Sequence, residues 1–344
     1  MSLRKALAGR ADLEIEWLEI PFDREGIGRV PVLGKNWTLR GSARCYDAIR
    51  RAVSRRPLDA LFIHTQTISL FSAGHMQRIP TLLSLDATPL NYDELAGSYG
   101  DSVHAAPVER LKTQAHRAVM RRAKQFTVWS DWTKASLVKD YGVDPERVVV
   151  IHPGTDLRNF PEPASRSPRA PGPLRLLFVG GDFVRKGGDL LVDVCRALEG
   201  KVELHLVTSA DVQAGNGVFV YRGLKPHSPE LLQRYRDADV FVLPTRGDCL
   251  AVVLGEAMAS CLPIITTRVG AHGEAVEDGE SGFLLDVDDG RGLRERLERL
   301  ASDPELVRRM GQRSRQVGEA RFDMLKNASQ IGDMLVALAT PRGV

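Results

Sequence analysis

Short apolar runs recur along the chain, and most of them end at a Gly, a Pro or a group of small polar residues. Such runs are typical of buried strands, whereas apolar residues spaced three or four apart are typical of helices. Strands that alternate with helices form parallel α/β sheets. The pattern predicts strands at 13–21, 58–64, 79–85, 126–129, 148–152, 174–179, 202–207, 218–221, 240–243 and 263–265. It predicts helices at 3–7, 37–56, 107–125, 132–141, 189–198, 229–236, 251–260, 290–301 and 304–320, a final helix with apolar residues between 322 and 338, and a polar loop at 91–104.

A proline-rich segment divides this pattern into two halves. Residues 161–173 hold five prolines, a composition that favours an extended linker. We therefore expect two Rossmann-like α/β domains, one at 1–160 and one that begins at residue 174. The chain has 344 residues, which is enough for two domains of ordinary size.

The beginning of the chain departs from the usual order of a nucleotide-binding α/β domain. Such a domain opens with a central strand and a glycine-rich turn, and neither precedes Leu3. A sheet without that strand would leave backbone groups of both neighbouring strands unpaired. We therefore expect that residues are missing upstream. The other interpretation is an N-terminal domain built without its first strand.

Three acids follow predicted strand ends in the second half. Asp248 lies in the loop after strand 240–243, Glu256 lies on the next helix, and Glu274 follows strand 263–265. Ligands of open α/β sheets bind beyond the carboxyl ends of the strands, where a carboxylate can accept hydrogen bonds from paired sugar hydroxyls. The alternative is that each acid is a solvated surface residue, but the repeated placement favours a binding site.

The loop after strand 174–179 combines glycines with cations. Gly180 and Gly181 open the loop, and Arg185 and Lys186 follow before the next helix. Glycines let the backbone approach a ligand closely, and the cations can hold a diphosphate. The alternative is an ordinary loop between a strand and a helix, with surface cations.

The stretch 239–285 resembles family 4 of the retaining glycosyltransferases, which have the GT-B fold. The family pattern is an acid, seven residues, Glu-Ala-Met-Ala, a Pro, a Thr pair or similar, Val-Gly-Gly, Glu, and Asp-Gly-Glu-Thr-Gly. The family usually has Glu where this chain has Asp248, whose carboxylate reaches one methylene less far. The segments 128–130 and 150–156 extend the resemblance to the first half, because the family reads Ile-Pro-Pro-Gly-Val-Asp there. The matching residues of the second half are Asp248, 256–259, Pro263, Thr266 and Thr267, Val269 and Gly270, Glu274, and 278–282.

The resemblance implies two domains that face each other across a cleft. The domain 174–320 would hold the nucleotide-diphosphate sugar, and a last helix within 321–344 would cross back to the first domain. The implied reaction transfers the sugar to an acceptor hydroxyl with retention at the anomeric carbon, without a metal or other cofactor. The implied catalytic residues are Arg185 and Lys186 at the departing diphosphate, Glu256 at the ribose and Asp248 at the donor sugar. The rest of the implied donor site is Gly180, Gly181, Cys249, Leu250, Ala251 and Glu274.

Polar residues after two predicted strand ends of the first half are candidates for the acceptor side. His64 and Gln66 stand at the end of strand 58–64, and Asp86 follows the strand that ends at Leu85. Many relatives have a His near the second strand end, where Leu85 stands here. His64 is equally well explained as a hydrogen-bonded residue at a strand end. The sequence does not distinguish among a glycan, a lipid and a small-molecule acceptor.

Composition excludes several other classes of protein. Hydrophobic residues make up 43% and charged residues 26% of the chain, which is typical of a globular protein. The net charge of +3 is too small to indicate a nucleic-acid partner. The four cysteines form no CxxC pair and no His/Cys cluster, so we expect reduced, buried thiols in the cytoplasm rather than disulfides or a zinc site.

The sequence also bears on membrane contact. No apolar run reaches the ~18 residues of a membrane span, and the first ten residues have no apolar core like that of a signal peptide. The helix 107–125 carries six basic residues and one acid, so it could contact anionic lipid headgroups at the inner membrane face. The alternative is a packed helix with a solvated basic face.

Two other functions stay open at this point. The Asp at position 248, the Leu at position 85 and the absent first strand fit a non-catalytic protein that binds a nucleotide-sugar. A nucleotide-sugar epimerase or a phosphorylase can share the same architecture, although the lysine context of a phosphorylase cofactor is not found. Transfer and hydrolysis assays distinguish the binding protein from the transferase, and product analysis distinguishes the other enzymes.

Overall fold

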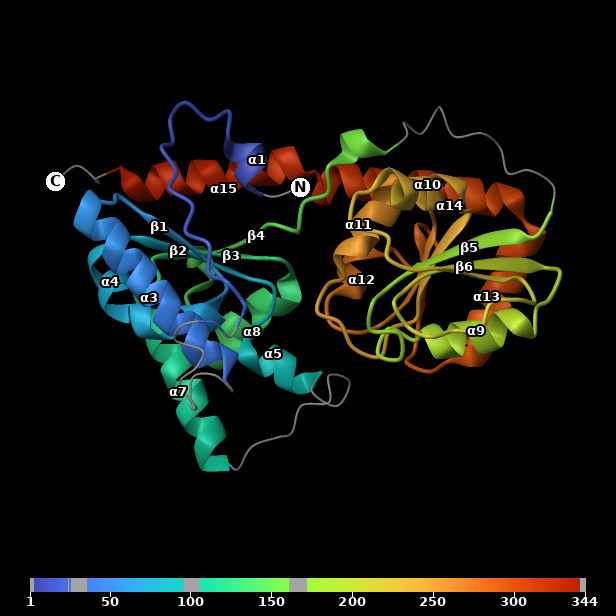
Figure 1. The fold of residues 1–344 in the computed structure, drawn as a ribbon, viewed down its shortest axis with the longest axis horizontal. Coiled ribbons are helices and arrows are strands. Elements are labelled where there is room, and N and C mark those ends of the chain that lie inside the picture. Colours follow the sequence, from blue (N-terminus) through green and yellow to red (C-terminus); the bar gives the residue numbers. More distant parts are fainter. Residues whose placement is uncertain (1–2, 24, 26–35, 96–105, 161–171, 341–344) are drawn as a thin grey trace. The chain divides into compact units, whose positions relative to one another are not determined.

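A computed structural model describes residues 3–23, 25, 36–95, 106–160 and 172–340 (Figure 1). These residues form two compact units, one made chiefly of 3–94, 106–152 and 328–340 and the other of 153–160 and 172–327. Each unit contains one parallel β-sheet with helices packed against it. The predicted α/β architecture with parallel sheets is therefore confirmed. Most of the predicted linker 161–173, and residues 96–104 of the predicted polar loop, lie outside the described residues.

The first unit is built on a four-stranded sheet in the order β1-β2-β3-β4. All its pairs are parallel, and the register places His64 beside Ser84 and Leu85 beside Val128. The carboxyl ends of β1, β2 and β3 therefore meet at one edge, where His64, Asp86 and Trp129 follow one another. The strands are β1 (Leu61–His64), β2 (Thr81–Leu85), β3 (Gln125–Val128) and β4 (Val148–Val150). The helices are α1 (Leu3–Leu7), α3 (Trp37–Arg55), α4 (Ala73–Arg78), α5 (Pro89–Glu94), α7 (Ala106–Arg122), α8 (Asp131–Tyr141) and the later part of α15 (Met324–Ala339).

The second unit is built on a six-stranded parallel sheet in the order β10-β9-β8-β5-β6-β7. From β5 the chain first builds outward through β6 and β7, and then returns to the other side of β5 to build β8, β9 and β10. The strand order thus reverses between β5 and β8, and the loops after these two strands border the crevice where open α/β sheets bind ligands. The strands are β5 (Leu174–Val179), β6 (Val202–Val207), β7 (Val218–Tyr221), β8 (Val240–Leu243), β9 (Ile264–Thr267) and β10 (Gly282–Leu285).

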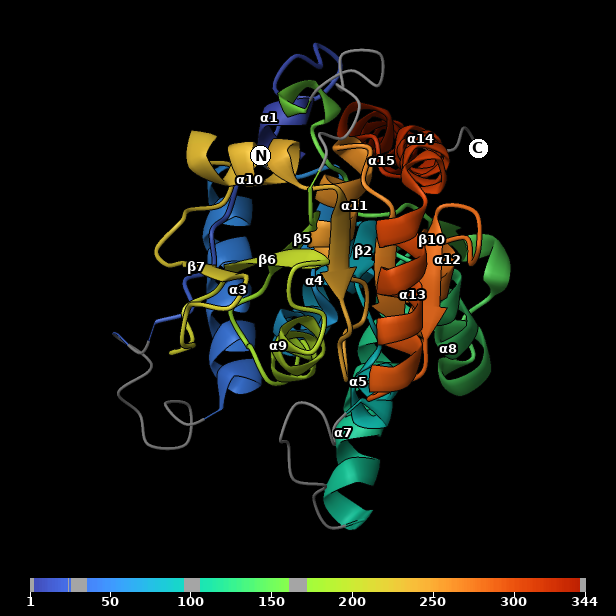
Figure 2. The same ribbon diagram turned by 90° about the vertical axis from the view of Figure 1, so that its right-hand side faces the viewer.

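Helices cover both faces of the six-stranded sheet (Figures 1 and 2). Strand residues such as Phe178, Phe241 and Ile265 are completely buried between the two helical layers, and removal of their apolar surface from water stabilises the unit. One layer holds α9 (Gly188–Arg196) and α13 (Gly290–Ser302), and the other holds α10 (Pro229–Asp237), α11 (Val252–Ala259) and α14 (Pro304–Arg321). The short helix α12 (His272–Ala275) follows β9.

The predicted strand at 13–21 is wrong, because the structure shows no strand there. Its acidic positions bind arginines of α3 and its C-cap instead of pairing with another strand. Glu16 forms an ion pair with Arg55, and Glu14 forms one with Arg56. In residues 13–21, the alternation of apolar and acidic positions therefore does not mark a strand. It marks a segment that ion pairs hold against a basic helix.

The predicted loop at 91–104 is wrong at its beginning, because residues up to Glu94 belong to α5. The Thr88 hydroxyl accepts the N–H of Asn91 at 3.1 Å, which satisfies one of the free amides of the first turn. Pro89, at the first helical position, has no N–H that needs a partner. The helices α4 and α12 and the strand β10 were not predicted from the sequence.

Candidate active site

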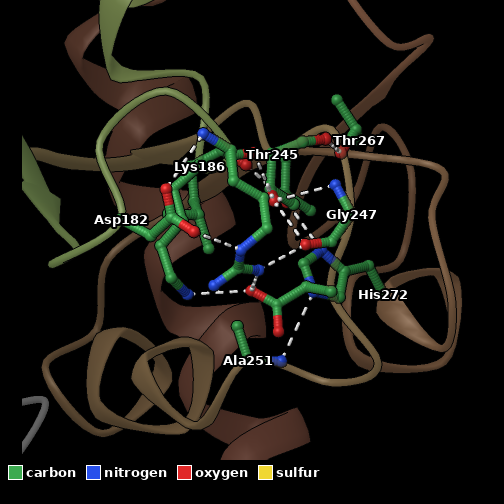
Figure 3. Close-up of polar contacts among 11 residues, drawn as sticks. Asp182, Lys186, Thr245, Gly247, Ala251, Thr267 and His272 are labelled. Atoms are coloured by element: carbon green, nitrogen blue, oxygen red, sulfur yellow. Dashed lines mark hydrogen bonds and ion pairs between the residues drawn. The ribbon is translucent and has the colours of Figure 1, made fainter. Parts of the chain in front are cut away.

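The loops after β5 and β8 bring two cations and one acid together (Figure 3). The Lys186 Nζ lies 2.8 Å from Asp248 Oδ2, and the Arg185 Nη1 lies 3.7 Å from the same oxygen. The three side chains are only 14–16% exposed. Residues that are 62 positions apart in the sequence thus form one partly buried ion cluster at the expected ligand crevice.

Further contacts fix Arg185 in this cluster. Its guanidinium donates to Asp182 Oδ2 at 2.8 Å and to the carbonyl oxygen of Gly247 at 2.5 Å. The hydrogen bond from Arg185 lowers the pKa of Asp182. Gly187 adopts a φ of 72°, and a Cβ there would lie 2.0 Å from the carbonyl oxygen of Pro244. Because this contact is with backbone, the two loops can approach this closely only if residue 187 is glycine.

The loop 248–251 is also held from the opposite side, by the turn between β9 and α12. The Ala271 N–H donates to the carbonyl oxygen of Cys249 at 2.7 Å. The Ala251 N–H donates to Nε2 of His272 at 3.3 Å. At Gly270, where φ is 50°, a Cβ would lie 2.3 Å from the carbonyl oxygen of Asp248. The backbone that carries Asp248 is therefore tightly packed on both sides.

Glu256 has different partners, on α10 and in the loop before it. The hydroxyl of Tyr235 donates to Glu256 Oε2 at 2.7 Å, and Nδ1 of His227 lies 3.9 Å from Oε1. Burial, and then the charge of Glu256, raise the pKa of Tyr235 well above its ordinary value, so the phenol stays protonated and can donate. Asp248 and Glu256 thus have different partners, although only seven residues lie between them in the sequence.

The other predicted donor residues surround these contacts. Gly180 lies directly after β5, and a Cβ there would lie 2.7 Å from Cδ of Lys186, whereas Gly181 has open space around its Cα. Leu250 and Ala251 are buried before α11. Glu274 is half-buried in α12, and its carbonyl oxygen accepts from Arg321 at 2.6 Å. The roles of these residues in donor binding stay predictions.

The acceptor-side candidates lie at the carboxyl edge of the four-stranded sheet. The imidazole of His64 stacks on Trp129 with the ring centroids 5.8 Å apart, and its Nδ1 lies 3.1 Å from Ser84 Oγ. Asp86 accepts a 2.6 Å hydrogen bond from the Tyr92 hydroxyl. Gln66 is 1% exposed and donates from Nε2 to the carbonyl oxygen of Ala87. The described contacts of Gln66 are internal, and the acceptor-side roles of His64, Gln66 and Asp86 stay predictions.

Two family models cover most of the chain. Residues 8–159 match the model described as Glycosyltransferase Family 4, and residues 173–303 match the model described as Glycosyl transferases group 1. The first match ends before the proline-rich segment, and the second begins at the last residue of that segment and covers the ion cluster.

The chain belongs to the family 4, group 1 glycosyltransferases.

Curated relatives of this glycosyltransferase include the D-inositol 3-phosphate glycosyltransferase of Thermobifida fusca, 31% identical over 234 residues, or 60% of this chain and 53% of the relative. Another is the putative colanic acid biosynthesis glycosyltransferase WcaL of Salmonella typhimurium, 31% identical over 220 residues, or 58% of this chain and 53% of the relative. The match thus spans about half the length of these relatives.

Solved structures show the same fold. The sucrose-phosphate synthase of Thermosynechococcus elongatus aligns with a TM-score of 0.70 and 20% identity over 90% of this chain and 79% of that one. Anabaena Alr3699/HepE, solved in complex with UDP-glucose, aligns with a TM-score of 0.64 and 16% identity over 92% of this chain and 85% of that one. The expected GT-B fold class is therefore confirmed.

Several residues at the candidate site were not predicted from the sequence. Tyr235 lies on a helix 21 positions before Glu256, and His272 interrupts the glycine-rich turn after β9. The imidazole among small residues in Gly-Ala-His-Gly is the only sequence signal for His272. Among the described residues, no group of three or more His, Cys, Asp or Glu side chains could hold a metal ion. No described helix combines the length and the apolar character needed to cross a membrane.

Two buried histidines are expected to make the stability of the protein depend on pH. Burial is the largest cause that lowers the pKa of both His116 and His272 to about 4, whereas a histidine in an unfolded chain titrates near pH 6.5. Between these values the unfolded chain binds more protons, so the free energy of unfolding increases as the pH rises from about 4 to about 6.5. Each histidine is expected to contribute about 2–3 kcal/mol at pH 7, and this contribution decreases as the pH falls towards 4.

Urea unfolding at several pH values between 4.5 and 7 measures this dependence. The double variant His116→Leu/His272→Leu is expected to show a shallower increase in the free energy of unfolding across this range. An equally steep increase in wild type and double variant would contradict the assignment of the pH dependence to these two imidazoles.

Proposed function

We propose that the protein is a retaining glycosyltransferase that transfers a sugar from a nucleotide-diphosphate sugar to an acceptor hydroxyl. The observation that carries the proposal is the cluster of Lys186, Arg185 and Asp248 at the reversal of strand order. Two cations beside one carboxylate offer both a site for a diphosphate and an acceptor for sugar hydroxyls. The family membership supports the same reaction class.

The chemical step requires stabilisation of the leaving group. The bond between the anomeric carbon and the diphosphate oxygen breaks, and a bond from that carbon to the acceptor oxygen forms on the same face. The acceptor proton passes to the leaving phosphate oxygen, so the step needs no separate general base. Arg185 and Lys186 would stabilise the negative charge that develops on the diphosphate. This is the charge that a divalent metal neutralises in other transferases, so we expect turnover in the presence of EDTA.

The ion cluster supports a nucleoside diphosphate sugar as the donor. The known relatives indicate which donors and acceptors to test first. HepE was solved with UDP-glucose, and curated relatives are named for an inositol phosphate and for colanic acid biosynthesis. We propose a nucleoside diphosphate sugar as donor and a glycan, a lipid or a small polyol as acceptor. His64 and Asp86 are the proposed acceptor contacts.

A two-stage experiment tests the proposed function. Thermal shift with nucleoside diphosphates and their sugars identifies the donor, and transfer or hydrolysis of that donor is then measured with and without EDTA. A transferase releases nucleoside diphosphate and gives a product with the donor's anomeric configuration. Binding without turnover would favour a non-catalytic binding protein, and a changed sugar still linked to the nucleotide would favour an epimerase.

Glu256 is expected to contribute to binding of every nucleotide, with or without a sugar. Glu256→Gln keeps the shape of the side chain and removes its charge. Because a hydrogen bond to a charged group contributes roughly 1.5–3 kcal/mol, the Kd of both nucleoside diphosphate and donor should rise about tenfold or more. Isothermal titration calorimetry measures both values.

Tyr235→Phe is the matched control for Glu256. It removes the described hydrogen bond to Glu256 but keeps the charge, so we expect a smaller loss of nucleotide affinity. If both variants lowered the free energy of unfolding and neither changed nucleotide affinity, Glu256 would have a structural role only.

The exposed side of α7 is the proposed site of peripheral membrane contact. Arg110, Leu111, Arg121 and Arg122 are exposed there, and Leu111 is 68% exposed. Cations near an anionic bilayer contribute about 1 kcal/mol each. All four cysteines are buried and none is part of a disulfide, which supports a reducing, cytoplasmic location, so the surface would meet the inner membrane face.

Sedimentation with lipid vesicles tests this contact. The protein should bind vesicles of phosphatidylglycerol and phosphatidylcholine more tightly than vesicles of phosphatidylcholine alone. Arg121→Glu/Arg122→Glu should weaken binding by about tenfold or more, because two favourable charges become unfavourable. Arg291→Glu/Arg294→Glu on α13 is the matched control. Equal binding to both kinds of vesicle, or equal effects of the two double variants, would contradict the proposal.

A further inference from the structure

His272 is a completely buried histidine that contacts Ala251, in the loop that also carries Asp248 (Figure 3). Its Nε2 lies 3.3 Å from the backbone nitrogen of Ala251, and its Nδ1 lies 2.9 Å from Oγ1 of Thr266. The Thr266 hydroxyl also lies 2.8 Å from the carbonyl oxygen of Leu243, at the end of β8. One chain of hydrogen bonds therefore joins the end of β8, β9, the first residue of α12 and the N-cap of α11.

The partners determine which ring nitrogen of His272 carries the proton. The Ala251 N–H can only donate, so Nε2 accepts and carries no proton. The Thr266 hydroxyl has one hydrogen, and it donates this hydrogen to the carbonyl oxygen of Leu243, which can only accept. The Nδ1 of His272 therefore donates to Thr266 Oγ1. The imidazole is neutral, in the Nδ1–H tautomer, and each of its ring nitrogens has one partner.

We infer that His272 is a positioning residue of the transfer reaction, which fixes the backbone of residues 249–251 and through it the carboxylate of Asp248. The inference rests on the proposed function. The loop has no side-chain cap at the start of α11, since Ala251 is the N-cap residue and makes no side-chain cap bond. The imidazole supplies an acceptor at this point instead. Both ring nitrogens are engaged by Ala251 and Thr266, so the imidazole acts on the loop through its backbone.

The buried position makes this hydrogen bond hard to replace. A buried N–H that loses its acceptor is destabilised by its lost hydration, so the loop would move to recover a partner. Small displacements of a reacting group from its productive position lower turnover strongly. Loss of the imidazole is therefore expected to shift Asp248 and the neighbouring amides, whereas Arg185 keeps its hydrogen bond to Asp182 within the loop after β5.

The charged groups around His272 agree with a neutral imidazole. Burial is the main cause that lowers its pKa to about 4, Lys186 lowers it further, and Asp248 raises it. A protonated ring would place two donors, Nε2–H and the Ala251 N–H, against each other. The Nδ1–H tautomer is therefore expected to persist throughout the neutral range.

The tautomer can be measured in the whole protein without any substrate. Nitrogen-15 NMR of histidine-labelled protein should show, at pH 7, one imidazole with a protonated Nδ1 and an unprotonated Nε2 that does not titrate above pH 5. This signal should disappear in His272→Leu. A protonated Nε2, or titration of this histidine near pH 6.5, would overturn the inference whether or not the protein proves to be a transferase.

Three variants then test the effect on the reaction. His272→Leu should lower kcat by about tenfold to a hundredfold and change the Kd of free nucleoside diphosphate by less than about threefold. His272→Gln can still accept from the Ala251 N–H through its side-chain carbonyl, so it should recover part of the lost kcat. His116→Leu removes a buried imidazole from the other unit and should leave kcat unchanged.

The outcomes separate a positioning role from a purely structural one. If His272→Leu and His116→Leu lowered the melting temperature equally and neither changed kcat, His272 would be structural only and the inference would be overturned. If His272→Leu does not fold, His272→Gln is measured instead. Unchanged kcat in His272→Gln, together with an Nε2–H tautomer in wild type, would exclude the positioning role of His272. If wild type shows no transfer with any donor that it binds, the proposed function fails, and the inferred role in transfer fails with it. The measured tautomer then still shows whether the hydrogen-bond geometry is correct.

Discussion

Replacing both Arg185 and Lys186 by alanine is expected to weaken the binding of a nucleoside diphosphate by about a hundredfold or more, since each charge-assisted hydrogen bond contributes roughly 1.5–3 kcal/mol. The two cations are 15% and 16% exposed, so water screens them only in part. Asp248 and Asp182 compete with the ligand for them, which places the expected loss at the lower end of the additive range.

Isothermal titration calorimetry with UDP, GDP and ADP measures this loss. Arg246→Ala is the matched control, because Arg246 is a half-buried cation in the loop after β8 that is paired with Asp189 and Asp288 instead of Asp248. It should change stability but leave nucleotide affinity within about twofold, as expected for a residue outside the site. Unchanged affinity in the double variant would exclude the loop after β5 as the diphosphate site. An equal loss of nucleotide affinity in Arg246→Ala would show that both substitutions act by disturbing the folding of the loops.

Most of the strands and helices could be predicted, because apolar runs and helical spacing are properties of residues close together in the sequence. Apolar runs such as 240–243 and 174–179 become buried strands wherever they stand in the chain. The failures have identifiable causes. Residues 13–21 alternate like a strand, but their acids pair with arginines of α3, a contact between segments about 40 residues apart. The short helix α5 depends on a capping hydroxyl and a proline, signals that are weak in a six-residue element.

The candidate site could be predicted only in its outline. The glycine-rich loop and the acids after strand ends identified Arg185, Lys186 and Asp248, because loops after parallel strands meet at one edge. The sequence could not show that Asp248 pairs with Lys186, since this contact depends on the close approach of two loops at Gly187. The bond between Tyr235 and Glu256 depends in the same way on how two helices pack.

The ion pair changes what is expected of Asp248. From the sequence, Asp248 should matter only for the intact donor. In the structure its carboxylate occupies the cations that a diphosphate needs. Removal of its charge should therefore release Lys186 and Arg185 for the ligand. We expect Asp248→Asn to bind free nucleoside diphosphate about three- to tenfold more tightly, the effect of losing one partly buried competing ion pair.

The same substitution should lower turnover. In the proposed reaction the diphosphate takes over Lys186, and the released Asp248 carboxylate accepts hydrogen bonds from the donor sugar. An amide accepts such bonds more weakly than a charged carboxylate. We expect kcat of Asp248→Asn to fall by about a hundredfold, comparable to the loss of one preorganised polar group at a reacting centre. Tighter binding of the product nucleotide would reduce the rate further by slowing its release.

Asp248→Glu is the matched variant that keeps the charge. It restores the residue usual in the family and extends the carboxylate by one methylene, so it should keep the competition for Lys186 and change the preference among donor sugars. Calorimetry with free nucleotide and steady-state kinetics with intact donor, measured on both variants, separate the two effects of the carboxylate. Weaker binding of the free nucleotide to Asp248→Asn would show that the carboxylate orders the loop and does not compete with the diphosphate. Unchanged kcat in that variant would exclude a contact with the donor sugar.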